Sequence, residues 1–362
     1  MKYVDEYRDV NKVKKLADMI NSQVRRPVYK IMEVCGTHTA SIHKFGLKSL
    51  LSKKIELISG PGCPVCVTSD GYLKNSLKLA KNRNIIVATY PDMLRVPVEG
   101  GSLEAARSEG ADVRGVNSAL EALDLAVRSA KREVVFLGVG FETTAPGTAI
   151  ALEAAKKDKI RNFSVYSAHK TIPEALIALG RDKGLALDGF LLPGHVSAII
   201  GMEGYRSVAK KVGLASVIAG FEPVDILLAI LKIVKAANVG ATILENEYTR
   251  IVTKSGNKQA QRLLKKVFIQ TDSIWRGLGV ISGTGLSIRG AFGGFDANKK
   301  FELPKEKVDK ALAGGCLCAE VLKGRITPQQ CPLFAKRCTP LSPKGPCMVS
   351  REGTCRAYFE FR

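Results

Sequence analysis

VYKIMEVCGTHT, residues 28–39, joins an apolar, β-branched run to a tight turn and then to polar residues that suit a helix start. The run predicts a buried strand, because strands covered on both faces read as nearly continuous apolar sequence. Gly36 permits the turn, and Thr37 or Thr39 can cap the helix that follows. The stretch therefore predicts one strand–loop–helix unit.

Similar units recur along the chain. Short apolar runs, each ending in a Gly, Pro or polar loop, lie at 55–59, 85–90, 134–139, 163–167, 189–192 and 215–220. An amphipathic helix is expected before them, at 10–24. This alternation predicts the α/β class, with parallel sheets covered by helices on both faces.

Two pairs of motifs suggest two similar halves. MEVCGTHT at 32–39 is similar to GVGFETTAP at 138–146, and GPGCPV at 60–65 is similar to LPGHVS at 192–197. We therefore expect two similar parallel-sheet α/β domains facing a cleft, followed by a Cys-rich C-terminal region. The expected divisions are an N-terminal helix at 1–27, domains at 28–130 and 131–250, and the C-terminal region at 251–362. Within that region, the Gly-rich stretch 276–295 is expected to be loop-like.

The composition narrows the possible partners and location. With 55 Lys and Arg against 34 Asp and Glu, the formal net charge is +21. No basic block, aromatic interleaving or zinc-finger pattern accompanies this charge, so a lysine-rich solvated surface is favoured over nucleic-acid binding. An acidic protein partner fits the charge equally well. Because the chain has no secretory signal and no apolar run of about 18 residues, we expect a cytoplasmic protein with reduced thiols and no membrane association.

Six of the nine cysteines lie in the last 47 residues: Cys316, Cys318, Cys331, Cys338, Cys347 and Cys355. Structural zinc sites usually contain paired C-x2-4-C ligands, which this region lacks. The irregular spacing and interposed prolines favour a [4Fe–4S] cluster, whose ligands can come from separate loops. We expect the ligands to be Cys316, Cys331, Cys338 and Cys355, with Cys318 and Cys347 as alternates. Zinc remains the alternative metal.

Cys63-Pro-Val-Cys66 is a CxxC pair that lies just before a helix expected from Asp70. Such pairs form a disulfide readily, and a thiol near a helix N-terminus has a lowered pKa. Half of a zinc site is the alternative reading. Redox chemistry is favoured, because no second CxxC lies nearby.

Cys35 and His38 place a thiol and an imidazole on one turn. Alone, this pair is a weak signal for nucleophilic catalysis. With the thiols of the next strand loop it favours a soft metal site of Cys35, Cys63 and Cys66, supported by His38.

Other polar groups also follow predicted strands, where open α/β sheets bind their ligands. These groups are candidates for acids, bases or supporting partners of a metal site: Glu33, Glu142, His169, His195 and Glu222.

The ordered series MEVCGTHT, GPGCPVC, YPDMLRVP, GFETTAP, YSAHK, PGHVSAIIG, GFEP and CPLFAKRCTPLSPKGPCMVSREGTCRAYF resembles the HypD family of hydrogenase maturation proteins, along nearly the whole chain. The resemblance implies two similar α/β units and a C-terminal [4Fe–4S] cluster. It implies a role in building the iron centre of [NiFe] hydrogenase, whose iron carries cyanide and carbon monoxide. Implied partners are a HypC-like chaperone, a HypE-like cyanide donor and, indirectly, the hydrogenase large subunit.

Carried onto this chain, the resemblance makes Cys35, Cys63 and Cys66 the iron or redox thiols, with His38 in support. The first hypothesis is therefore an assembly scaffold with redox activity, and not an enzyme that turns over a free substrate. The alternative is a [4Fe–4S]-dependent thiol–disulfide oxidoreductase. A nucleic-acid-binding iron–sulfur protein is the third and weakest reading.

Overall fold

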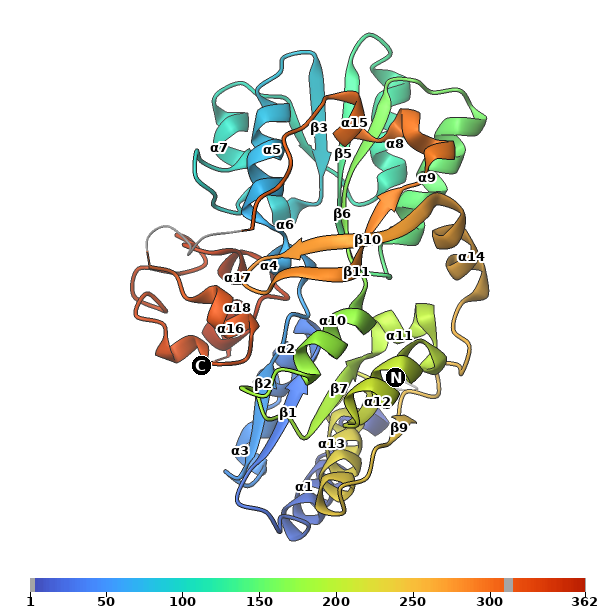
Figure 1. The fold of residues 1–362 in the computed structure, drawn as a ribbon. Coiled ribbons are helices and arrows are strands. Elements are labelled where there is room, and N and C mark those ends of the chain that lie inside the picture. The colour runs from blue at the N-terminus through green and yellow to red at the C-terminus, as the bar shows by residue number, and fades with distance from the viewer. Residues whose placement is uncertain (1–3, 309–314, 362) are drawn as a thin grey trace.

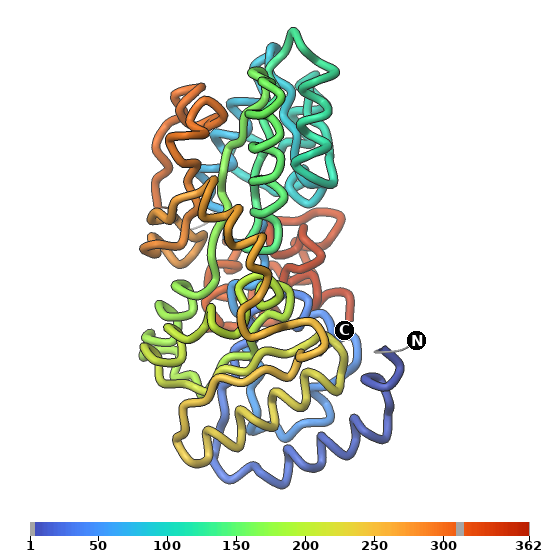
Figure 2. Tube along the Cα trace, turned by 90° about the vertical axis from the view of Figure 1, so that its right-hand side faces the viewer, coloured from blue at the N-terminus to red at the C-terminus, as the bar shows by residue number. Residues whose placement is uncertain are grey.

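The structure, a computed structural model, describes residues 4–308 and 315–361. All seven expected strands form, and they belong to two parallel sheets, so the predicted α/β class is confirmed. Figure 1 shows the two sheets one above the other, with an antiparallel hairpin crossing between them. Figure 2, turned by 90°, shows that the molecule is elongated along the same direction. No helix among the described residues has the length and apolar character needed to cross a membrane.

Sheet A carries the first strands of the chain. Its five parallel strands have the order β2-β1-β7-β8-β9. Their bounds are β1 Tyr29–Glu33, β2 Ile55–Ser59, β7 Gly189–Pro193, β8 Ala215–Ala219 and β9 Leu244–Asn246. β1 has a neighbour on each side, because Ile31 pairs with Ile55 of β2 and with Gly189 of β7. The loop after β1 is therefore flanked by the loops after β2 and β7.

Sheet B has four parallel strands in the order β4-β3-β5-β6. Their bounds are β3 Ile85–Thr89, β4 Val113–Gly115, β5 Glu133–Gly140 and β6 Phe163–His169. Within the two parallel sheets, the strands without a counterpart among the expected ones are β4 and β9, at three residues each. Such short strands give too little periodicity to be recognised in the sequence.

The chain leaves sheet A after β2, builds all of sheet B, and returns to sheet A at β7. Each sheet contains strands from both sides of the boundary expected at 130/131, so that boundary does not separate the sheets. Strand–loop–helix alternation predicts parallel strands, but it does not identify which strands pair. The cleft expected between two domains stays a prediction.

Helices cover both sheets. The longer helices are α1 Val10–Ser22, α2 Gly36–Lys44, α5 Asp70–Ala80, α8 Ala119–Arg128, α9 Ala145–Lys157, α10 Ile172–Gly180, α13 Pro223–Asn238 and α14 Lys258–Val267. The shorter ones are η1 Asp5–Tyr7, α3 Leu47–Leu50, α4 Pro64–Val67, α6 Pro91–Leu94, α7 Leu103–Ser108, α11 Gly194–Ile200, η2 Met202–Tyr205 and α12 Arg206–Val212. α13 packs on β8 and α1, whereas α8 and α9 pack on β5.

The stretch 276–295, expected to be loop-like, forms a strand instead. β10 Phe268–Trp275 and β11 Gly279–Ile288 make an antiparallel hairpin. Gly277 and Gly279 have φ of +79° and form its bend, so these glycines mark a turn and not an irregular segment. After the hairpin come short elements: η3 Gly290–Phe295, α15 Ala297–Lys300, α16 Cys318–Leu322, η4 Pro328–Gln330, α17 Pro346–Val349 and α18 Thr354–Glu360.

Three buried clusters form the interior. One lies between sheet A, α1 and α13, and another lies between sheet B, α8 and α9. The third contains residues of both sheets together with thiols from the CPVC loop and the C-terminal region. The cysteines therefore belong to the core where the two sheets and the C-terminal segment meet.

Candidate functional site: a chain of buried thiols

The CGTH turn lies at the carboxyl end of β1, in the middle of sheet A. Cys35 occupies the N-cap position of α2 and is buried. A β-carbon on Gly36 would lie 2.0 Å from the backbone oxygen of Glu352 in the C-terminal segment. The first turn of α2 is thus pressed against that segment, and only glycine fits there.

His38 is fully buried and held in one orientation. Its Nε2 lies 2.9 Å from the carbonyl oxygen of Gly220, in the loop after β8. Because a carbonyl only accepts hydrogen bonds, Nε2 carries the proton, and Nδ1 has a free lone pair. Nδ1 has no hydrogen-bond partner among the described residues. Burial lowers the pKa of His38 to about 4, so the ring is neutral at physiological pH.

Cys35 is protonated in this environment. Burial raises the pKa of its thiol to about 11, and the charge of Glu352 adds to the rise. A thiol becomes a strong metal ligand only as the thiolate. A cation that binds here would therefore displace the proton of Cys35.

The CPVC loop follows β2, the strand beside β1. Cys63 is the N-cap of the single-turn helix α4, and its sulfur accepts a hydrogen bond from the backbone N–H of Cys66. The two sulfurs lie 2.6 Å apart as free thiols, about half an ångström longer than a disulfide bond. This pair needs little movement to be oxidised.

The CPVC and CGTH loops touch through their backbones. A β-carbon on Gly62 would lie 2.5 Å from the nitrogen and Cα of Cys35. Adjacent parallel strands thus bring the two loops together, as expected for strand ends at one edge of a sheet. The Cys35 thiol itself interacts with Thr37 and with the backbone of His38, and the charge of Glu352 acts on it.

A series of thiol contacts runs from the CPVC loop into the C-terminal region. Cys66 contacts Cys347, and Cys347 also contacts Cys318 and Cys355. Cys318 in turn contacts Cys316. Burial raises the pKa of the Cys66 thiol well above its usual value. The contacts therefore connect Cys63 to Cys316 through a row of buried sulfurs.

The remaining C-terminal thiols surround the end of this row. The charges of Cys316 and Cys355 act on the Cys338 thiol, which also accepts a hydrogen bond from the backbone N–H of Lys344. A β-carbon on Gly345 would lie 2.7 Å from the sulfur of Cys316. Cys331 is buried seven residues before Cys338. Across the ranges that the structure describes, no three Cys, His, Asp or Glu side chains are arranged to hold a metal ion. The proposed three-thiol iron site and the choice of cluster ligands stay predictions.

The supporting residues expected near the thiols fall into two groups: Glu33, His195 and Glu222 lie at or just after strand ends of sheet A, whereas Glu142 and His169 lie at or just after strand ends of sheet B. Phe221 brings His38 and His195 together, with ring centroids 4.9 and 4.2 Å away. Glu222, beside Phe221, caps α13 and forms an ion pair with Arg8, which indicates a structural role.

Glu33 is fully buried at the end of β1, two residues before Cys35. It accepts hydrogen bonds from Thr39 at 2.5 Å and from Ser59 at 3.5 Å. Burial raises the pKa of its carboxyl. Glu33 therefore ties the CGTH helix to the adjacent strand.

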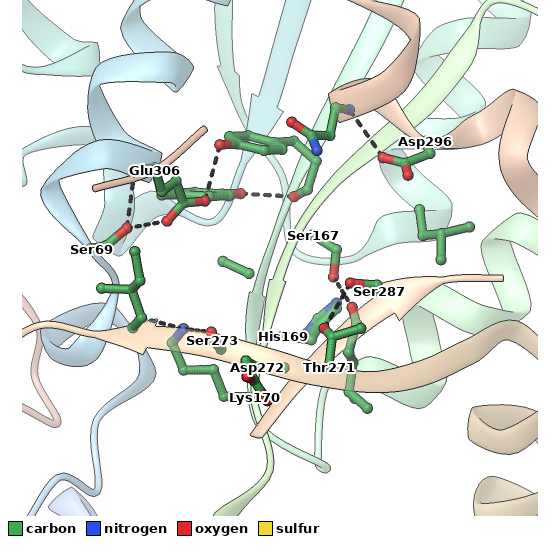
Figure 3. A pocket seen from close by; sticks show the side chains of 18 of the residues that line it. Ser69, Ser167, His169, Lys170, Thr271, Asp272, Ser273, Ser287, Asp296 and Glu306 are labelled. Carbon is green, nitrogen blue, oxygen red and sulfur yellow. Dashed lines mark hydrogen bonds between the residues drawn. The ribbon is translucent and has the colours of Figure 1, made fainter. Parts of the chain in front are cut away.

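Glu142 and His169 lie at the ends of β5 and β6 in sheet B. His169 shares a 2.9 Å hydrogen bond with Thr148, and burial lowers the pKa of its ring to about 4. It borders a polar cavity of about 290 Å³ between the hairpin and sheet B (Figure 3). Figure 3 shows Ser69 and Glu306 on one side of this cavity, and Lys170 and Ser273 on the other. The structure does not group Glu142 and His169 with the thiols.

Arg276 is a residue near the thiols that the sequence did not reveal. Its side chain is 1% exposed, forms an ion pair with Asp70 at 2.5 Å and donates to the carbonyl of Thr68 at 2.8 Å. Its charge favours the thiolate forms of Cys316 and Cys318. A buried cation therefore lies between the end of the CPVC helix and the C-terminal thiols. Nothing in the local sequence distinguishes it from a surface arginine.

Comparisons with known proteins identify the family of the chain. The HypD family model, described as "Hydrogenase formation hypA family", matches residues 11–362. The "Hydrogenase maturation factor HypD" of Rhodobacter capsulatus is 42% identical, over 100% of this chain and 98% of its own length. The protein of the same name from Escherichia coli is 41% identical, with the same coverage. The "Hydrogenase expression/formation protein HupD" of Azotobacter chroococcum is 43% identical, over 100% of this chain and 97% of its length.

Solved structures add nothing to the fold argument. A conserved domain protein from Vibrio cholerae aligns with 75% of this chain and 99% of its own at 11% identity, with a TM-score of 0.14. The family assignment therefore depends on full-length sequence similarity and on the series of motifs. On that basis, this chain belongs to the HypD family.

Proposed function

We propose that this protein is a hydrogenase maturation factor and that it is the scaffold on which the iron of [NiFe] hydrogenase acquires its cyanide and carbon monoxide ligands. Full-length relatives at about 40% identity carry hydrogenase maturation in their names. The observation that carries the finer proposal is the row of thiols from Cys63 to Cys316, which are all buried except the half-buried Cys316. It joins a loop beside Cys35 to the Cys-rich C-terminal region.

The C-terminal region suits a [4Fe–4S] cluster by its donor set. Cys316, Cys338 and Cys355 are close enough for their charges to interact, and Cys331 precedes Cys338 in the same loop region. These four would hold the cluster, because thiolates are its usual ligands. Cys318 and Cys347 then lie between it and Cys66. When bound, the cluster would supply single electrons.

The iron being assembled is the cargo. A low-spin iron that binds cyanide and carbon monoxide is soft, and thiolates of Cys35, Cys63 and Cys66 suit it. The free lone pair on Nδ1 of neutral His38 provides a supporting ligand or acceptor. If Cys63 and Cys66 become a disulfide, two electrons and two protons return them to thiols. A cluster held by the C-terminal thiols would supply these electrons one at a time, drawing them from an external one-electron donor, and Cys347 is the thiol that contacts Cys66.

The same proposal implies partners. A HypC-like chaperone and a HypE-like cyanide donor would meet the scaffold in the cytoplasm, and the finished group would pass to the hydrogenase large subunit. The strongly basic chain suits acidic partner proteins. We expect no nucleic-acid or membrane partner.

The alternative function is a [4Fe–4S]-dependent thiol–disulfide oxidoreductase. It is favoured by the same 2.6 Å approach of Cys63 and Cys66 and by their contact with the C-terminal thiols. It leaves Cys35 and His38 without a metal to bind. Turnover of generic dithiol substrates at a catalytic rate would support it.

Infrared spectroscopy distinguishes the two functions. Protein purified anaerobically together with its HypC-like partner should show bands of metal-bound cyanide and carbon monoxide. It should also be brown, with about four iron and four sulfide per chain from the cluster. Cys331→Ala or Cys338→Ala should remove the colour, whereas Cys35→Ala should keep it. A colourless protein with stoichiometric zinc would refute the cluster.

A further inference from the structure

A second cavity, of about 380 Å³, lies among α10, α11, α12, α14 and the hairpin. Neither the thiol row nor the proposed iron chemistry uses it. Its inner end contains Glu142 and Thr171, which are buried, and its outer end contains Lys265, Ile269 and Arg289, which are exposed. The cavity therefore leads from solvent to two buried polar side chains.

Glu142 is 3% exposed and has only one of its oxygens satisfied. Oε1 accepts the backbone N–H of Ile172 at 2.9 Å, which fixes the carboxyl group at the start of α10. Oε2 is buried and has no hydrogen-bond partner among the residues that the structure describes. Buried polar atoms in folded proteins are nearly always paired, so an unpaired carboxyl oxygen on a residue that lines a cavity indicates a missing partner.

Thr171 presents a second unpaired atom at the same end. It is 7% exposed, and its backbone N–H donates to the carbonyl of Thr284 at 2.8 Å. Its hydroxyl is buried and, within the described ranges, makes no hydrogen bond. A hydroxyl can donate where a carboxylate oxygen can only accept. The two side chains together suit a head group with one donor and one acceptor, side by side.

Beyond these two side chains the cavity walls are mainly apolar, and the outer end carries positive charge. The walls between the inner and outer ends are formed mainly by Pro173, Ile200, Leu264, Phe268 and Leu286. At the outer end, Arg289 donates through Nε to the carbonyls of Lys265 and Phe268 at 2.8 and 2.9 Å, which holds its guanidinium at the rim. Lys265 adds a second positive charge there. An apolar body with an anionic end complements this path.

We propose that this cavity binds a small carboxamide with an apolar body and an anionic tail. The amide N–H donates to Oε2 of Glu142, and the hydroxyl of Thr171 donates to the amide oxygen. The tail lies between Lys265 and Arg289. A volume of about 380 Å³ is in the range of small-molecule sites.

This site is independent of the proposed iron chemistry, although it lies near it. The charges of Glu142 and Cys35 both act on the buried hydroxyl of Tyr205. Tyr205 therefore lies within electrostatic range of both Glu142 and the CGTH turn. Binding of the carboxamide requires neither iron nor the cluster, so failure of either proposal leaves the other standing.

The test uses 4-carbamoylbenzoate, which has the amide, the apolar ring and the carboxylate. Titration of the full-length protein by calorimetry or ligand-observed NMR should give saturable binding. Glu142→Gln keeps an oxygen for Ile172 but presents an amide N–H₂ to the ligand, and should weaken binding at least tenfold. Thr171→Val should weaken it at least fivefold. Lys265→Gln should weaken it two- to fivefold, while leaving the affinity for benzamide unchanged.

Glu174→Gln is the matched control, because Glu174 borders the same cavity but takes no part in the proposed hydrogen bonds. This variant should bind within twofold of the wild type. Equal affinity of the wild type, Glu142→Gln and Thr171→Val would overturn the proposal, as would the absence of saturable binding. If both inner variants fail to fold, a wild-type crystal soaked with the probe decides. Amide density against Glu142 supports the site, and density elsewhere or none refutes it.

Discussion

The carboxyl ends of β1 and β5 carry similar sequences, MEVCGTHT and GVGFETTAP, yet they occupy different surroundings. At the end of β1, the CGTH turn, with its thiol and neutral imidazole, lies against the C-terminal segment and the backbone of the CPVC loop. At the end of β5, a carboxyl group lies at the bottom of an apolar cavity. The local strand–turn–helix unit is alike in both. The chemistry of each end is therefore set by its own reactive side chains together with the segments that cover them.

Loss of the thiol at the first end should have the largest effect. Cys35→Ala should eliminate the cyanide and carbon monoxide bands and hydrogenase maturation, because no oxygen ligand has the softness of a thiolate. The protein should still fold, since the substitution removes one sulfur from a loop. Complementation of a strain that lacks the native gene measures maturation, and circular dichroism checks the fold. Normal maturation by Cys35→Ala would disprove the thiol mechanism.

The packing of the C-terminal segment against the CGTH turn can be tested by substituting two glycines in turn. Gly36→Ala places a methyl group 2.0 Å from a backbone oxygen and should lower the free energy of unfolding by about 3 kcal/mol or more. Gly147→Ala, in α9 beside β5, meets nothing within 4 Å and should be neutral or stabilising by up to about 1 kcal/mol. Urea unfolding measures both. Equal effects would mean that the C-terminal segment is not packed against the CGTH turn.

The stability of the protein should depend on pH through the Glu142 carboxyl at the end of β5. Burial raises the pKa of Glu142 from 4.5 to about 7. The protonated form of Glu142 adds to the free energy of unfolding. This contribution is fully present below about pH 4.5 and is lost as the pH rises through about 7. Relative to Glu142→Gln, the wild type should therefore lose about 3 kcal/mol of unfolding free energy from pH 4.5 to pH 8. Glu174→Gln should follow the wild type, and parallel curves for Glu142→Gln and the wild type would contradict the burial of a lone carboxyl.

His38→Gln should have a smaller effect than Cys35→Ala. The amide can still donate to the carbonyl of Gly220, but it lacks the Nδ1 lone pair. We expect about a 10–100-fold loss of iron retention, as is typical when a supporting group of a metal site is removed. Iron content after gel filtration measures this loss. An effect as large as that of Cys35→Ala would make His38 a primary ligand.

The sequence predicted the longer strands of the two parallel sheets well, but it missed the β10–β11 hairpin and did not identify which strands pair. Each of the seven expected strands is a short β-branched run followed by a Gly, Pro or polar loop, and these local signals are reliable. The pairing of Ile31 with Gly189 depends on packing across 158 residues, which no local pattern reports. The thiol motifs were also recognisable, but the contact of Cys66 with Cys347 was not, because it joins segments 281 residues apart.

The insertion of sheet B between β2 and β7 has a consequence for synthesis on the ribosome. When Cys35, Cys63 and Cys66 have left the ribosome, β1 still lacks its neighbour β7, which ends at Pro193. The contact between Gly36 and Glu352 must wait for nearly the whole chain. Because chains emerge from the N-terminus, sheet B can fold while sheet A is still incomplete. Unfinished chains therefore lack the packing around these loops, so a truncated protein should not assemble the proposed iron site.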